Sequence, residues 1–101
     1  VVEPIYGGVS MEEQVRRLRR GAHIVVGTPG RIIDHVNRGT LNLSGVNTLV
    51  LDEADIMLDM GFREEVDEIL KTIPKDREIW LFSVTVKQGI DDIIRDHMRN
   101  V

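Results

Sequence analysis

The sequence predicts an α/β fold in which a parallel sheet of about four strands is flanked by helices. Four short runs of apolar and β-branched residues alternate with segments whose apolar residues recur at helical spacing. The segments between the runs are long enough to cross over as helices, which parallel neighbouring strands require. No repeat, linker or low-complexity stretch interrupts the pattern, so the 101 residues are expected to form one domain.

The first two strands are predicted at residues 2–6 and 23–26. Between them, Ser10 and Glu13 have the spacing of a capping box at the start of a helix, and a glycine ends it. Thr28 is expected to cap a second helix, whose first residue is a proline with the φ angle suited to that position. The apolar faces of the two helices are formed by Met11, Val15, Leu18, Ile32, Ile33 and Val36.

The third and fourth strands are predicted at residues 49–51 and 78–82. A short helical turn around Met57 and a longer helix closed by Pro74 lie between them, and a last helix follows. Trp80 lies inside the fourth run and is predicted to belong to the core. The apolar faces of the longer helix and the last helix are formed by Val66, Ile69, Leu70, Ile73, Ile90, Ile93, Ile94 and Met98.

The composition excludes several classes of protein. Apolar residues at 42% and charged residues at 30% are typical of a folded soluble domain. Cysteine is absent, which excludes disulfides, thiolate zinc sites and a cysteine nucleophile, and we expect a reducing, cytoplasmic location. The apolar runs are too short to span a bilayer. A net charge of −4 argues against nucleic-acid binding by a generally basic surface, so any such contact must be local.

An unusual short sequence follows the carboxyl end of every predicted strand. Loops that follow parallel strands emerge at the same edge of a sheet, where binding crevices form. The four sequences are Gly7-Gly8, Thr28-Pro29-Gly30-Arg31, Asp52-Glu53-Ala54-Asp55 and Ser83-Val84-Thr85. Their coincidence predicts a functional site at this edge.

The acidic sequence has the side chains for metal-assisted chemistry on phosphate. Magnesium prefers hard oxygen ligands and usually takes one or two protein carboxylates, which Asp52 and Glu53 can provide. The second carboxylate could then orient or deprotonate an attacking water. Hydroxyls of Ser83 and Thr85 could donate hydrogen bonds to Asp55. An acidic helix start followed by ordinary helix caps remains an alternative for the same residues.

The two glycine-containing sequences suit a phosphate backbone. A helix that begins at Pro29 presents free N–H groups to an anion, and Arg31 could add a bidentate contact. Glycines at positions 7, 8 and 30 would allow a sugar-phosphate chain to approach closely. A plain helix cap and a plain turn are the alternatives.

Taken together and in this order, the four sequences resemble the motifs of the DEAD-box family of ATP-dependent RNA helicases. Asp52-Glu53-Ala54-Asp55 spells the motif that names the family, and Phe82-Ser83-Val84-Thr85 is similar to its Ser-Ala-Thr motif. The resemblance covers essentially the whole chain. It implies that residues 1–101 form part of one RecA-like domain of the P-loop NTPase type, its carboxyl-terminal half without the phosphate-loop half.

The resemblance also implies residue roles and partners. Asp52 would hold Mg²⁺ through water, Glu53 would activate the water that attacks the γ-phosphate of ATP, and Asp55 would bond to Ser83 and Thr85 to couple hydrolysis to unwinding. RNA would be bound through its backbone, not by its sequence, and the partners would include the missing half and a second RecA-like domain. The residues implied to contact RNA are Gly7, Gly8, Thr28, Pro29, Gly30 and Arg31.

Departures from the family pattern lead to further expectations. Val84 stands in place of alanine, and we expect crowding there to perturb coupling. No glycine-rich phosphate loop is present, so the isolated chain should be inactive. Without its neighbour, the strand at 78–82 should have an open apolar edge that favours self-association. Two alternatives remain open: a receiver- or flavodoxin-like magnesium-binding domain, and a non-catalytic excised or engineered half-domain.

Overall fold

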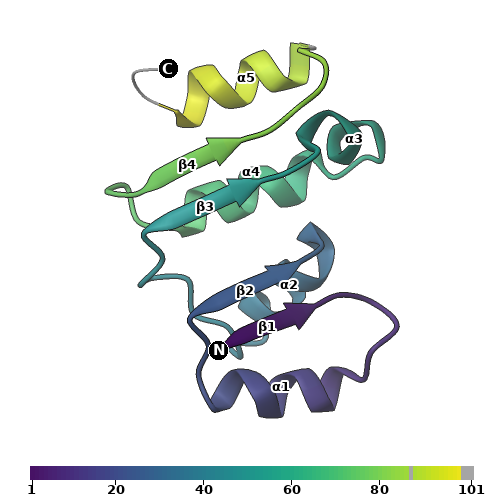
Figure 1. Ribbon diagram of the computed structural model, residues 1–101, viewed down its shortest axis with the longest axis vertical. Helices are drawn as coiled ribbons and strands as arrows, with labels where there is room; N and C mark the ends of the chain where they lie inside the picture. The colour runs from purple at the N-terminus through teal and green to yellow at the C-terminus, as the bar shows by residue number, and fades with distance from the viewer. Residues whose placement is uncertain (87, 99–101) are drawn as a thin grey trace. The chain divides into compact units, whose positions relative to one another are not determined.

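The computed structural model describes residues 1–86 and 88–98. The chain divides into two compact units, Val1–Leu43 and Ser44–Val101. Each unit contains one pair of parallel strands together with its own helices (Figure 1). The predicted α/β class with parallel strands flanked by helices is therefore confirmed.

In the first unit, the carboxyl ends of the two strands leave no room for a side chain between them. Its elements are β1 (Val2–Ile5), α1 (Met11–Arg19), β2 (Ile24–Gly27) and α2 (Pro29–Asn37). Ile5 lies opposite Gly27 in the parallel ladder, and a Cβ atom at Gly27 would overlap the main-chain oxygen of Ile5. Glycine is thus required here, and the loops that follow β1 and β2 leave the sheet side by side.

The two helix starts of this unit differ in how their caps are formed. Ser10 accepts a hydrogen bond from the main-chain N–H of Glu13 at 3.4 Å, as the predicted capping box requires. Thr28 is the N-cap residue of α2, as predicted, and has an extended conformation, but its side chain makes no capping hydrogen bond. Pro29 at the first position needs no N–H partner, which reduces the need for a side-chain cap.

The second unit repeats the parallel pairing with longer helices. Its elements are β3 (Thr48–Leu51), α3 (Ala54–Asp59), α4 (Arg63–Thr72), β4 (Glu78–Leu81) and α5 (Gln88–His97). The pairing continues beyond the strand ends, because the Phe82 N–H donates to the Leu51 carbonyl at 2.8 Å and the Ala54 N–H donates to the Phe82 carbonyl at 3.0 Å. These bonds join the loop after β3 to the loop after β4.

Among the described residues, strand pairing is found within each unit only. The strands therefore form two two-stranded sheets, where the sequence predicted one sheet of about four strands. Both sheets are parallel, and the carboxyl ends of their strands bear the motif loops as predicted.

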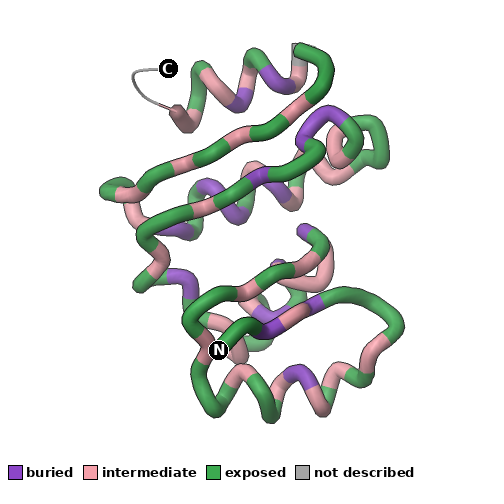
Figure 2. Tube along the Cα trace, in the orientation of Figure 1, coloured by how far each residue is buried: buried purple, intermediate pink, exposed green. Residues whose placement is uncertain are grey.

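The core of the second unit lies on one face of its sheet (Figure 2). Its buried apolar residues, which include most of those predicted for α4 and α5, are Leu51, Ala54, Val66, Ile69, Leu70, Ile73, Ile90 and Ile93. Neighbouring strand residues point to opposite faces. The other face bears Val50, Trp80 and Phe82, which are 55%, 53% and 50% exposed. The prediction that Trp80 belongs to the core is wrong, because no described element covers this face.

Replacing Gly27 with alanine is expected to destabilise the first unit by about 3 kcal/mol, because the added methyl group would collide with a main-chain atom that cannot rotate away. Gly30→Ala is the matched control: no atom lies within 4 Å of its Cβ position, and alanine favours a helix by up to about 1 kcal/mol. Urea unfolding monitored by circular dichroism would compare the two variants. Equal midpoints would contradict the prediction.

Candidate functional site

The acidic loop after β3 divides into exposed and buried carboxylates. Asp52 and Glu53 are exposed, whereas Asp55 is only 6% exposed. Asp52 accepts a hydrogen bond from the Glu53 N–H at 2.9 Å through Oδ1, and Asp55 accepts one from the Ile56 N–H at 3.0 Å. The first two acids are thus accessible to a ligand, while the third is part of the interior.

Glu53 has a left-handed backbone conformation, with φ 52° and ψ 45°. It is the only non-glycine residue with positive φ in the described ranges 1–86 and 88–98. This conformation costs an L-residue roughly 1–2 kcal/mol, and such strain persists mainly where the surroundings impose it, often at functional sites. The hydrogen bonds of Ala54 to Phe82 and of Glu53 to Asp52 hold the turn on both sides.

The buried carboxylate joins the two motif loops of the second unit. Asp55 Oδ2 accepts hydrogen bonds from the main-chain N–H of Thr85 at 3.1 Å and from its hydroxyl at 2.9 Å. The Thr85 hydroxyl is the largest cause of a lowered pKa for Asp55, and the Thr85 and Ile56 N–H groups and the Ser83 hydroxyl add to it against the effect of burial. A carboxyl group whose pKa is lowered by folding stabilises the folded state at pH values above its ordinary pKa. This stabilisation is lost as the pH falls through the lowered pKa.

The two hydroxyls of the Ser83-Val84-Thr85 loop have different partners. The Ser83 hydroxyl donates a hydrogen bond to the main-chain oxygen of Thr85 at 2.6 Å, whereas the hydroxyl and the main-chain N–H of Thr85 donate to Asp55. Val84 is 92% exposed. Within this chain the side chain is not crowded, and the expected effect of the valine on coupling in a complete protein stays a prediction.

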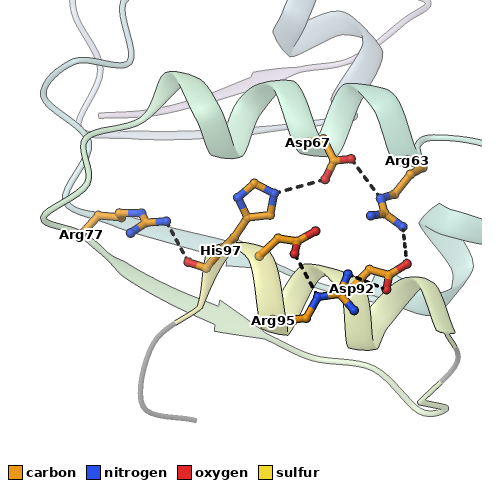
Figure 3. A network of polar contacts seen from close by, with 7 residues as sticks. Arg63, Asp67, Arg77, Asp92, Arg95 and His97 are labelled. Atoms are coloured by element: carbon orange, nitrogen blue, oxygen red, sulfur yellow. Dashed lines mark hydrogen bonds and ion pairs between the residues drawn. The ribbon is translucent and has the colours of Figure 1, made fainter.

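A network of polar contacts holds the helix that follows this loop (Figure 3). Arg63 on α4 contacts Asp67 at 3.0 Å and reaches Asp92 on α5 at 3.4 Å. His97, near the end of α5, lies 3.3 Å from Asp67, and its main-chain oxygen accepts a hydrogen bond from Arg77 at 2.8 Å. Partly exposed ion pairs contribute up to about 1 kcal/mol each, but together they fix α5 on α4 at both of its ends.

In the first unit, two motifs separated in the sequence come into contact. A Cβ atom at Gly7 would lie 3.8 Å from Nη2 of Arg31, so the guanidinium lies beside the glycine pair. Gly8 has φ +89°, a conformation that favours glycine, and no atom lies within 4 Å of its Cβ position. The glycine loop and the start of α2 thus form one surface at the carboxyl ends of β1 and β2.

The start of α2 leaves its backbone open. Thr28 is exposed, Pro29 is buried, and no atom lies within 4 Å of the Cβ position of Gly30. The first N–H groups of a helix have no partner within the helix, so they are available to an anion that approaches along this open side. Arg31 is the nearby cation.

A buried polar cluster lies behind this surface and was not found from the sequence. The side chains of Gln14 and His35 are fully buried, and Gln14 Oε1 lies 2.9 Å from His35 Nε2. His35 Nδ1 lies 2.8 Å from the Thr40 hydroxyl, and Gln14 Nε2 donates to the Tyr6 carbonyl at 3.0 Å. Burial, with smaller contributions from nearby arginines, lowers the pKa of His35, so the imidazole is neutral at pH 7.

One signal for this cluster is present in the sequence. Gln14 lies three residues after Met11 and four before Leu18, so it shares the apolar face of α1. A lone amide on such a face must find hydrogen-bond partners in the interior. The identity of those partners depends on the tertiary structure.

Neither a metal-binding cluster nor a membrane-spanning helix is found in the part of the chain that the structure describes. Within residues 1–86 and 88–98, no group of three or more histidine, aspartate or glutamate side chains could hold a metal ion. The magnesium prediction therefore depends on the exposed carboxylates of the acidic loop, Asp52 and Glu53. No helix in the same part of the chain is long and apolar enough to cross a membrane.

Comparison with known proteins decides the family. A family model described as DEAD/DEAH box helicase matches residues 1–93. The chain belongs to this family. The membership agrees with the resemblance drawn from the four motifs, and it favours the helicase interpretation over the receiver-like alternative.

Similar DEAD-box proteins are longer than this chain. It is 54% identical over 97 residues to "DEAD-box ATP-dependent RNA helicase CshA" of Geobacillus kaustophilus, covering 96% of this chain and 21% of that relative. It is 56% identical over 99 residues to "ATP-dependent RNA helicase DeaD" of Buchnera aphidicola, covering 98% of this chain and 16% of the relative. A solved DEAD box protein from Methanococcus jannaschii matches with a TM-score of 0.93 and 48% identity, over 98% of this chain and 27% of that one.

The strain at Glu53 can be measured by substitution. Glu53→Gly is expected to be more stable than Glu53→Ala by about 1 kcal/mol, because glycine adopts positive φ without the steric cost of a Cβ atom. Urea denaturation of the two variants would give the difference. Glu64→Gly and Glu64→Ala, on the exposed start of α4, provide the control pair, in which alanine should be the more stable. If Glu53→Ala were more stable than Glu53→Gly, the prediction of backbone strain at this position would be contradicted.

Proposed function

We propose that this chain is part of an ATP-dependent RNA helicase and forms the carboxyl-terminal half of its first RecA-like domain. The observation that carries the proposal is the pair of hydrogen bonds from Thr85 to Asp55, which joins the acidic loop to the loop after β4. A chemical change at one loop can thereby move the other. Relatives named as RNA helicases support the assignment, and because the chain spans about a fifth of their length, the complete activity belongs to a longer protein.

The acidic loop would supply the chemistry on ATP. Magnesium keeps several water ligands and takes one or two protein carboxylates, and the exposed carboxylate of Asp52 would hold it through one of these waters. When bound with the nucleotide, magnesium supplies positive charge that neutralises the phosphate oxygens. Glu53, exposed on the adjacent strained turn, would orient the attacking water and accept its proton.

The first unit would contact the RNA backbone. The open start of α2 offers N–H groups and Arg31 offers a guanidinium, both of which bind phosphate without reading bases. A local site of this kind is compatible with a net charge of −4. The residues proposed to contact RNA are Gly7, Gly8, Thr28, Pro29, Gly30 and Arg31.

The bare face of the second sheet supports the proposal that residues 1–101 form a partial domain. Parallel sheets are normally covered on both faces. The described elements leave Val50, Trp80 and Phe82 about half exposed on one face. In the longer protein, we propose that the phosphate-loop half of the same domain covers this face. The second RecA-like domain would be a further partner.

The proposal has consequences for the isolated chain. It lacks a glycine-rich phosphate loop, so alone it should hydrolyse no ATP, because phosphoryl transfer depends on positioning and charge that the missing part supplies. ATP and RNA are found together inside the cell, which supports a cytoplasmic site of action for the longer protein.

The role of Glu53 can be tested in a longer helicase that contains this segment. Glu53→Gln is expected to reduce RNA-stimulated ATP hydrolysis at least about a hundredfold, because the amide cannot accept a proton from water. Binding of a fluorescent ATP analogue should be retained. Glu64→Gln, an exposed residue of α4, is the control and should hydrolyse ATP at the unmodified rate. Hydrolysis by Glu53→Gln within twofold of the unmodified protein would exclude the proposed role.

Self-association is proposed for the isolated chain through the uncovered sheet. Among the described strands, only β3 pairs with β4, so one edge of β4 is open beside the exposed rings of Trp80 and Phe82. Sedimentation velocity should show a mass above the monomer that increases with concentration. Trp80→Lys should return the chain to the monomer, whereas Met60→Lys, at an exposed apolar residue outside the sheet, should not. A strict monomer at high concentration would refute this proposal.

A further inference from the structure

The amide of Gln14 connects three separate segments of the first unit. It lies on α1, donates to the Tyr6 carbonyl after β1 at 3.0 Å, and faces His35 on α2 at 2.9 Å. Its oxygen also accepts from Nη1 of Arg31 at 3.5 Å. Gln14 is 0% exposed, so its side chain has no contact with solvent and interacts only with these protein groups.

The directions of these hydrogen bonds are fixed by the partners. A carbonyl oxygen such as that of Tyr6 can only accept, so the Gln14 NH₂ group must face it. The Gln14 oxygen then faces Arg31 and His35, both of which must donate. The neutral imidazole therefore has its proton on Nε2. The Thr40 hydroxyl has a single proton and lies within hydrogen-bond distance of both His35 Nδ1, at 2.8 Å, and the main-chain oxygen of His35, at 3.1 Å.

The segments that Gln14 connects are those proposed to bind the RNA backbone. Tyr6 immediately precedes the glycine pair, and Arg31 lies beside Gly7. We propose that Gln14, held in place by His35, is a positioning residue for RNA binding: it fixes the glycine loop through the Tyr6 carbonyl and orients the guanidinium of Arg31. This inference rests on the proposed function and adds to it the element that organises the phosphate-binding surface.

A neutral amide is well suited to this task. A guanidinium on a flexible stem binds phosphate bidentately only when its plane is held, and the Gln14 oxygen provides a fixed acceptor for Nη1. A carboxylate at the same position would form an ion pair with Arg31 and reduce the positive potential available to phosphate. The neutral amide orients the Arg31 guanidinium without neutralising its positive charge, which therefore stays available to phosphate.

The test uses the longer helicase and a short fluorescent oligouridylate, with RNA affinity measured by anisotropy over a range of potassium chloride concentrations. Gln14→Met keeps the volume and removes the hydrogen bonds. We expect it to weaken RNA binding about tenfold and to reduce the slope of log affinity against log salt by about one, as Arg31→Ala should. Glu12→Gln, exposed on the same helix, is the control and should change neither quantity.

Two further comparisons separate positioning from a loss of folding. In the double variant with Arg31→Ala, Gln14→Met should cost less affinity than it does alone, because part of its effect acts through Arg31. If Gln14→Met fails to fold, Gln14→Glu keeps the volume and the acceptor oxygens, and should also bind RNA more weakly with a smaller salt slope. Thermal melting identifies the folded variants.

The outcomes distinguish this inference from the proposed function. If Arg31→Ala weakens RNA binding while a folded Gln14 variant binds as the unmodified protein does, the positioning role is overturned and the RNA contact stands. Strictly additive effects of Gln14→Met and Arg31→Ala would also overturn it. If Arg31→Ala itself leaves RNA binding unchanged, the proposed RNA surface fails.

Discussion

The hydrogen bonds to the buried carboxylate of Asp55 are the interaction on which the second unit depends. A charge in the interior is tolerated only when donors surround it, and here the donors come from Thr85, in the loop after β4, and from Ile56, in the first turn of α3. The loop after β4 is therefore bound to the loop after β3 by electrostatics as well as by the strand ladder. Any ligand that moves Asp52 or Glu53 would act on the same short turn, so its effect would reach the loop of Thr85 without a long pathway.

The first unit uses a neutral cluster for a similar purpose. Gln14 and His35 fill a buried position with polar groups that satisfy each other, and they join two helices to the loop after β1. An apolar pair of the same volume could pack there, but it could not select one orientation for Arg31 or hold the Tyr6 carbonyl. In both units a buried polar contact thus determines how the loops at the carboxyl ends of the strands are arranged.

Features that depend on residues close together in the sequence could be predicted from the sequence alone. The side-chain cap of α1 by Ser10 and the buried apolar faces of α4 and α5 follow from short-range spacing, and the structure has them. Trp80 was assigned wrongly because a continuous apolar strand indicates that both faces are buried, but not which segment covers each face. The partner of the Ser83 hydroxyl and the exposure of Val84 depend on the course of a loop between two elements. The partners of Gln14 lie eight to twenty-one residues away, beyond the reach of any periodicity.

The uncovered face of the β3–β4 sheet has a consequence for cellular quality control. Trp80 and Phe82 lie with their ring centroids 6.5 Å apart on a surface that a complete domain would cover. During synthesis, or after cleavage by a protease, a species without that cover would display paired aromatic rings next to an open strand edge. Chaperones and degradation enzymes recognise surfaces of this kind. If the two rings lie in the interior of the complete domain, as we propose, then their exposure would mark an incomplete domain for chaperones and degradation enzymes.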